Sequence, residues 1–133
     1  MTLLIDTDVI IRGERGLFDL PSWLEVLPDG VPHIAAITVA ELWHGVQRAT
    51  GSHVHRREAY LKMIFEMLPI LPYTEMTALE HAKIWVELES SGNMIGYYDL
   101  IVAATALEHA GGVETFNERH FAKVAGLRVI KPR

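Results

Sequence analysis

Cysteine is absent from the 133 residues of this chain. This excludes disulfide bonds, thiolate zinc sites and cysteine nucleophiles, and it is compatible with a reducing compartment, so we expect a cytoplasmic location. An excess of positive charge is also absent, because 17 acidic residues outnumber 12 basic ones and the formal net charge is −5. This balance argues against a protein that grips a polyanion through bulk electrostatic attraction. Any nucleic acid would need local contacts or metal ions.

Long hydrophobic runs are missing as well. No uncharged stretch approaches the roughly 18 apolar residues that a membrane helix needs, and no basic region precedes the first apolar run. We therefore expect neither a membrane contact nor a cleaved leader. Half of the residues are hydrophobic, which is enough for one core, and we expect a single domain over residues 1–133.

Short apolar runs alternate with stretches of helical period. We expect strands at Thr2–Ile5, His33–Ile37, Ile70–Leu71, Val113–Thr115 and Arg128–Ile130. We expect helices after Asp6 and at Ser22–Leu27, Thr38–Gly51, His53–Met67, Thr74–Ser90, Asp99–Ala110 and Arg119–Val124. Because parallel strands need crossover connections that helices fill best, this alternation predicts an α/β fold, with a mostly parallel central sheet of four or five strands flanked by helices.

Two helices carry further expectations. In Thr74–Ser90 the apolar period predicts an inward face, made by Leu79, Ala82, Trp85, Val86 and Leu88. The stretch Asp99–Ala110 is apolar nearly all round and should be buried on most sides, with Gly111-Gly112 closing it.

Acids or an amide stand where apolar runs meet predicted helices, in Leu3–Asp8, Ile37–Leu42, Tyr98–Ala104 and Thr115–Glu118. In parallel sheets the functional crevice lies beyond the carboxyl ends of the strands. Asp6 stands there, at the end of an interior strand, where an unpaired carboxylate costs several kcal/mol unless it is neutralised or coordinated. The pattern indicates a convergent acidic site for a hard divalent cation.

Each of the other acids also has an explanation by itself. Asp8 fits the N-cap of a helix, Thr38 and Glu41 form a capping-box pattern, and Asp99 suits the positive end of a helix dipole. Taken together, several carboxylates share a pocket only where a charge offsets their repulsion, and Mg²⁺ or Mn²⁺ would supply that charge. The seven histidines include no His-x-x-x-His pair that would indicate zinc.

The order and spacing of these motifs resemble the PIN-domain ribonucleases, and in particular the VapC-like toxins of prokaryotic toxin-antitoxin pairs. The similarity runs over Leu4–Asp8, Thr38–Leu42, Tyr98–Ala104, Thr115–Asn117 and Ala125–Ile130. It implies a toxin that cleaves RNA phosphodiesters with metal-activated water. It also implies that Asp6, Glu41 and Asp99 are the catalytic, metal-binding acids, with Mg²⁺ or Mn²⁺ as cofactor.

Asn117 stands where the family often has a fourth acid, and it contributes no charge to a second metal site. Glu118 or Asp8 would replace that charge, and Thr7 and Thr115 match small hydroxyl positions that orient ligands. Candidate RNA contacts are Arg12, Arg15, Arg48, Arg56 and Arg57.

The resemblance further implies a cognate antitoxin and a homodimer. Apolar contacts for such partners would come, if they are exposed, from Phe18, Trp23, Leu24 and Trp43. Ordinary core packing is the alternative for each of these side chains.

Two other functions remain open. Asn117 motivates an inactive PIN-like module that binds RNA or protein. Asp6-Thr7-Asp8 also looks like the first motif of haloacid dehalogenase-type phosphatases, although the lysine and the further acidic pair of that family are not evident.

Overall fold

Five parallel strands form the centre of the molecule, in the order β3-β2-β1-β4-β5. In this computed structural model, which describes residues 1–133, they are β1 (Thr2–Ile5), β2 (Val31–Ala35), β3 (Ile70–Leu71), β4 (Gly112–Glu114) and β5 (Arg128–Ile130). The predicted α/β fold is confirmed, and the sheet is parallel throughout. The carboxyl ends of all five strands therefore meet at one edge.

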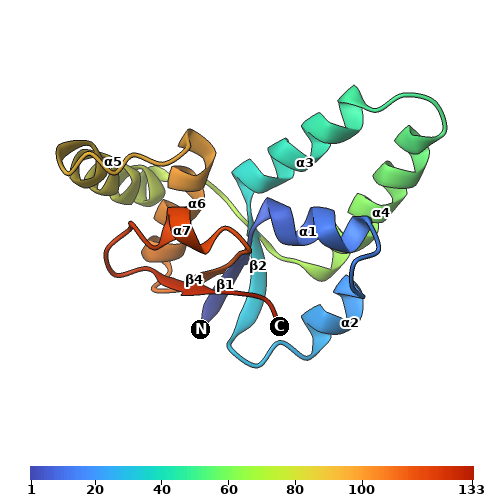
Figure 1. Cartoon of the computed structure of the whole chain (residues 1–133), viewed down its shortest axis with the longest axis horizontal. Coiled ribbons are helices and arrows are strands. Elements are labelled where there is room, and N and C mark those ends of the chain that lie inside the picture. Colours follow the sequence, from blue (N-terminus) through green and yellow to red (C-terminus); the bar gives the residue numbers. More distant parts are fainter.

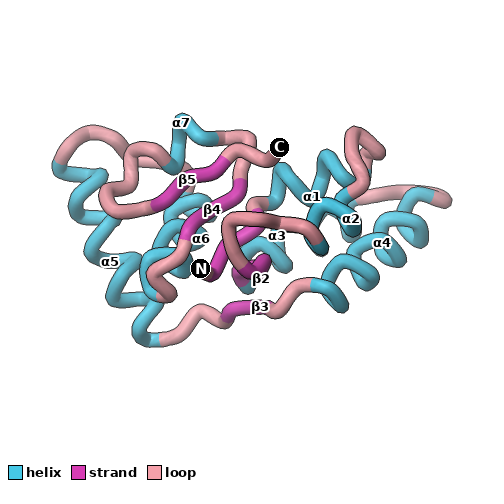
Figure 2. Tube along the Cα trace, turned by 90° about the horizontal axis from the view of Figure 1, so that it is seen from below, coloured by secondary structure: helices cyan, strands magenta, loops and turns pink.

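Seven helices cover the two faces of the sheet. They are α1 (Thr7–Glu14), α2 (Leu20–Glu25), α3 (Ala36–Arg48), α4 (His53–Met67), α5 (Glu75–Ser90), α6 (Tyr97–Glu108) and α7 (Glu118–Phe121). Successive strand residues point to opposite faces, so Leu4 joins the core under α5, α6 and α7, whereas Ile5 joins the core under α1 to α4. Figures 1 and 2 show α5 and α6 on one side of the molecule and α1, α2 and α4 on the other.

Strand β2 lies two residues earlier than predicted, at Val31–Ala35, because its pairing with β1 begins at Val31. The strand includes Pro32, although proline has no N–H for a sheet ladder. On that side of β2, however, the short strand β3 begins only opposite Ile34, whose N–H donates to the Pro69 carbonyl at 2.9 Å. Pro32 therefore lies beyond the point where a partner strand could accept a hydrogen bond.

Three predicted helix starts are corrected. The N-cap of α1 is Asp6 and not Asp8, because the carboxylate of Asp6 accepts from the Thr7 N–H at 2.9 Å. Helix α3 begins at Ala36 without a side-chain cap, so the capping box of Thr38 and Glu41 does not form. Helix α6 begins after Gly96, which places Asp99 within the first turn. The remaining predicted elements agree with the structure to within three residues at each end.

The predicted inward face of α5 is wrong except at Leu88. The buried positions of this helix are Thr77, Ile84 and Leu88, while Leu79, Ala82, Trp85 and Val86 are exposed. The polar Thr77 takes a buried position because its hydroxyl donates a hydrogen bond to Glu108 of α6. The exposed side of the helix carries Leu79, Trp85 and Val86, so an apolar surface faces outward.

The predicted glycine cap of α6 is also wrong. Ala110, and not a glycine, takes the left-handed conformation after the helix, with a φ of 51°. The Gly111 N–H still donates to the Ala106 carbonyl at 2.8 Å, but the need for glycine at 111 and 112 comes from the sheet. A Cβ at Gly111 would collide with the Thr2 carbonyl, and one at Gly112 would lie 2.8 Å from the Arg128 carbonyl. These glycines are required because β4 approaches the backbone of its neighbours closely.

Exchange of Ala110 for Gly is expected to raise the free energy of unfolding by about 1 kcal/mol, because the left-handed conformation costs alanine about that much and glycine almost nothing. Urea denaturation measures the difference. Ala125→Gly, at an exposed position without a positive φ, is the control and should not stabilise the protein. A fall in stability of Ala110→Gly would contradict the prediction.

Candidate active site

Asp6 lies at the carboxyl end of the central strand β1, and only 5% of it is exposed. One carboxylate oxygen accepts from the Thr7 N–H, and the other accepts from the Thr115 hydroxyl at 2.8 Å. Burial raises the pKa of Asp6 to about 7, and the neighbouring charges of Asp8 and Asp99 add to the shift. An ionised Asp6 is therefore costly, which is the condition that a bound cation relieves.

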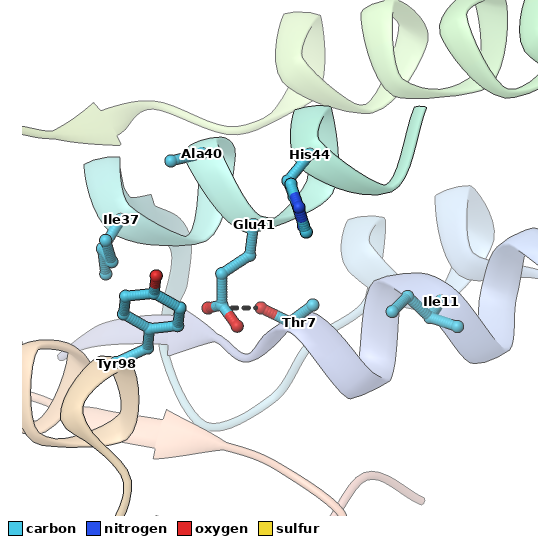
Figure 3. Close-up of a pocket in the computed structure, with 7 residues that line it drawn as sticks. All are labelled: Thr7, Ile11, Ile37, Ala40, Glu41, His44 and Tyr98. Atoms are coloured by element: carbon cyan, nitrogen blue, oxygen red, sulfur yellow. Dashed lines mark hydrogen bonds between the residues drawn. The ribbon is translucent and has the colours of Figure 1, made fainter. Parts of the chain in front are cut away.

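Glu41 reaches the same region from α3. The Thr7 hydroxyl donates to its carboxylate at 3.0 Å, as Figure 3 shows. Burial raises the pKa of Glu41, and the charge of Asp99 acts in the same direction. Because Thr7 also donates its N–H to Asp6, this one residue of α1 connects Asp6 at the end of β1 with Glu41 of α3.

Asp8 holds the loop that follows β4 instead of capping α1. Its carboxylate accepts from the Phe116 N–H at 3.2 Å, and it lies 3.4 Å from the Thr115 hydroxyl, whose single proton points to Asp6 at 2.8 Å. Burial raises the pKa of Asp8. The Thr115 hydroxyl also accepts from the Asn117 N–H at 2.9 Å, so this side chain orders the loop around the two N-terminal acids.

Asp99 lies in the first turn of α6 and faces α7. The Nδ1 atom of His120 is 3.2 Å from the Asp99 carboxylate and 2.9 Å from the Asn117 side-chain nitrogen. This nitrogen donates a proton to Asp99 or accepts one from Asn117, but not both at once. Asn117 therefore contacts the acidic site through His120.

The acids of the site influence one another electrostatically. Asp99 raises the pKa of both Asp6 and Glu41. Even so, no group of three acidic or histidine side chains lies close enough together to bind a metal ion by itself. The carboxylate oxygens have the chemistry that Mg²⁺ or Mn²⁺ prefers, and such ions usually keep several waters, so a closed protein cage is not required. The residues fit a partly hydrated ion.

A comparison with models of protein families matches residues 3–127 to the model described as "PIN domain". The chain belongs to the PIN-domain family. The matched residues include Asp6, Glu41 and Asp99, so the resemblance indicated by the sequence motifs is confirmed.

Named relatives of this PIN domain include "Ribonuclease VapC1" from Rickettsia felis, which is 30% identical over 98% of this chain and 96% of its own length. A VapBC2 structure from Rickettsia felis, bound to a promoter DNA fragment, has a TM-score of 0.89 at 22% identity and covers 98% of each chain. Another, VapBC-5 from Mycobacterium tuberculosis, is described as a member of a family of toxin-antitoxin systems; its TM-score is 0.76 at 26% identity, again over 98% of each chain.

The five candidate arginines of the PIN domain differ in their surroundings. Arg57 is bound to Glu14 at 3.2 Å and to the Gly45 carbonyl at 2.9 Å, so its charge is already used within the fold. The guanidinium of Arg12 lies 3.9 Å from the centre of the Phe116 ring. Arg15, Arg48 and Arg56 are exposed and form no ion pair, and only Arg48 among these lines a cavity together with Glu41.

Glu118 is exposed in the first turn of α7 and forms no hydrogen bond with the other acids. It therefore does not join the acidic cluster as arranged. Two residues beside the PIN-domain acids were missed by sequence reasoning, namely His44 and Tyr98, which line a cavity of about 490 Å³ with Thr7 and Glu41 (Figure 3). The spacing Glu41-x-x-His44 was an available signal, since residues three apart share a helix face.

Proposed function

We propose that this PIN domain is a metal-dependent endoribonuclease that acts as the toxin of a toxin-antitoxin pair. The observation that carries the proposal is the buried Asp6, whose pKa is raised to about 7 by burial and by the charges of Asp8 and Asp99. A carboxylate held in this state serves catalysis when a cation offsets it. The ribonuclease name of a relative that is 30% identical supports RNA as the substrate.

Asp6, Glu41 and Asp99 are the residues that would hold Mg²⁺ or Mn²⁺. The ion, when bound, supplies a water of lowered pKa and a positive charge beside the scissile phosphate. The chain's own task is orientation. The Thr115 hydroxyl and the Thr7 N–H fix the two oxygens of Asp6, and the Thr7 hydroxyl fixes Glu41. No nucleophilic side chain is needed for this chemistry.

One feature supports one ion rather than two. Asn117 carries no charge, and its side chain contacts His120, so it adds no carboxylate for a second ion.

Removal of divalent metal is expected to abolish RNA cleavage by the purified protein, since the ion is proposed to supply both the activated water and the positive charge beside the phosphate. The measurement is cleavage of a folded RNA with loops and helices after dialysis against EDTA, followed by addition of Mg²⁺ or Mn²⁺. Exposed Glu25 on α2 provides a matched control, because Glu25→Gln should leave the restored activity unchanged. Cleavage that persists without metal would overturn the proposal.

An antitoxin is the proposed partner, on the strength of the toxin-antitoxin description of a relative that is 26% identical. The candidate apolar contacts Phe18, Trp23 and Trp43 are half-buried and Leu24 is buried, so core packing explains them. The exposed apolar face of α5 is a better candidate for the homodimer, which stays a prediction. None of the helices has the length and apolar character needed to cross a membrane. A cytoplasmic location is part of the proposal.

The two other functions are not favoured. The family match over residues 3–127 gives no support to a haloacid dehalogenase-type phosphatase. An inactive module is disfavoured because Asp6, Glu41 and Asp99 all keep their carboxylates, and Asp99 acts electrostatically on both of the others.

A further inference from the structure

Glu41 lines three neighbouring cavities along α3. The first, of about 420 Å³, also has Gly96, Tyr97, Tyr98 and Asp99 in its wall. The second, of about 490 Å³, is lined further by Thr7, Ile11, Ile37, Ala40, His44 and Tyr98. The third, of about 350 Å³, is completed by His44, Gly45, Arg48, Ala49 and Arg57. Because neighbouring cavities share Tyr98 or His44 in addition to Glu41, they form one groove, here called the α3 groove.

The chemistry of the α3 groove changes along its length. Its first end carries the carboxylate of Asp99, its middle is walled by Ile11, Ile37 and the Tyr98 ring, and its last end carries the free guanidinium of Arg48. An acidic end, an apolar middle and a basic end match the parts of a nucleotide chain. The cleavable phosphate would meet the acids through a cation, a base would meet the apolar walls, and the next phosphate would meet Arg48.

Tyr98 is the residue that gives the middle of the groove its character. Its side chain projects from the start of α6 into the space beside Glu41 (Figure 3), and 54% of the residue is exposed. None of the aromatic pairs within the chain includes Tyr98. Its neighbour Tyr97, in contrast, packs edge-on against Trp85 at 6.4 Å. The Tyr98 ring is thus available to a ligand.

We infer that the middle cavity of the α3 groove takes one unpaired nucleobase of the RNA substrate, stacked on Tyr98, while Arg48 contacts the adjoining phosphate. The inference rests on the proposed function. The cavity volume lies within the range of about 300–1,000 Å³ that is typical of small-molecule sites. A base within a duplex cannot enter such a cavity, so the groove selects RNA that is single-stranded beside the cleaved bond.

Tyr98 acts here as a positioning residue, and the test is the affinity for RNA. The probe is a fluorescent 12-nucleotide RNA of mixed sequence. Its affinity for the Asp99→Asn protein, which is expected to bind RNA without cleaving it, is measured by fluorescence anisotropy in Mg²⁺. In this background Tyr98→Ala should weaken binding by about tenfold or more, whereas Tyr98→Phe, which keeps the ring, should stay within about twofold. Arg48→Gln should weaken binding and reduce its dependence on salt.

Two controls make the result specific. Tyr73→Ala removes an exposed tyrosine that does not line the groove and should not change the affinity. The same RNA annealed to its complement should bind more weakly and should not respond to Tyr98→Ala. Three results would each overturn the inference. They are equal RNA affinities with Ala and with Tyr at position 98, no binding of the RNA at all, or an equal effect of Tyr98→Ala on the affinity for the duplex.

Cleavage by the parent sequence separates this inference from the proposed function. If the parent protein cleaves RNA while Tyr98→Ala keeps the same KM and RNA affinity, the base site is wrong and the nuclease assignment stands. If RNA binds through Tyr98 but the parent never cleaves it, the base site stands and the nuclease assignment fails. If the α3 groove binds a co-expressed protein and has no affinity for RNA, the groove belongs to a protein partner and the base site is wrong.

Discussion

Replacement of Asp99 by Asn is expected to reduce the rate of RNA cleavage by about a hundredfold or more while the protein stays folded. Asp99 acts electrostatically on both Asp6 and Glu41. Asparagine keeps the size of the side chain but removes the charge that attracts a divalent cation. The measurement is the initial rate of cleavage of a folded RNA in Mg²⁺ or Mn²⁺, compared with the parent protein at equal concentration.

Glu118→Gln is the matched control for this loss of charge. Glu118 lies in α7, close in sequence to His120, but it is exposed and forms no hydrogen bond with the acidic cluster. Its variant should cleave within about twofold of the parent rate, and thermal melting should show that both proteins are folded. An Asp99→Asn protein as active as its parent would show that the acidic site has been assigned incorrectly.

The Asp6→Asn variant is expected to be more stable than the parent at pH 8, and also inactive. The pKa of Asp6 rises from 3.8 in the unfolded chain to about 7 in the folded protein, mainly through burial. A raised pKa means that folding favours the protonated form. The contribution of Asp6 to stability is therefore fully present below about pH 4, is lost as the pH rises toward 7, and changes no further above that value. The neutral asparagine avoids this loss, which is about 4 kcal/mol as an upper value.

Asparagine fits the hydrogen bonds at position 6. Its carbonyl oxygen accepts from the Thr7 N–H, and its amide donates to the Thr115 hydroxyl oxygen. Urea denaturation from pH 4 to pH 9 without divalent metal measures the effect. Part of the slope should remain in Asp6→Asn, because burial also raises the pKa of Glu114 to about 7. A variant that is less stable than the parent at pH 8 would contradict the argument.

Addition of Mg²⁺ links the two expected results. A cation that binds the ionised carboxylate of Asp6 should stabilise the parent at pH 8 by mass action, while Asp6→Asn should gain little. The gain in stability and the loss of activity would then have one origin. The parent chain keeps an unfavourable buried charge because its proposed chemistry uses it.

Much of the fold was predictable from local patterns, because short apolar runs and amphipathic stretches carry the strand and helix periods. Strand β1 and helix α4 appear with the predicted bounds. The errors arose where tertiary contacts decide. Strand β2 starts at Val31, where its pairing with β1 begins, and α5 buries the polar Thr77, whose hydroxyl donates to Glu108 of α6. Neither contact can be inferred from a short stretch of sequence.

The candidate site was predictable in its acids but not in their connections. The positions of Asp6 and Asp99 followed from the motifs, whereas the role of Thr7 as the link to Glu41 required the placement of α3 beside α1. Tyr98 belongs to one of the sequence motifs, but a motif does not tell whether an aromatic ring is packed or exposed. Its exposure became apparent only from the packed structure.

The hydrogen bond between Thr115 and Asp6 joins residues that are 109 positions apart. A growing chain on the ribosome exposes Asp6 first, yet it cannot complete the orientation of that carboxylate before the segment after β4 has been synthesised and has docked. The contacts around Asp6 are therefore complete only after most of the chain has been made and has folded.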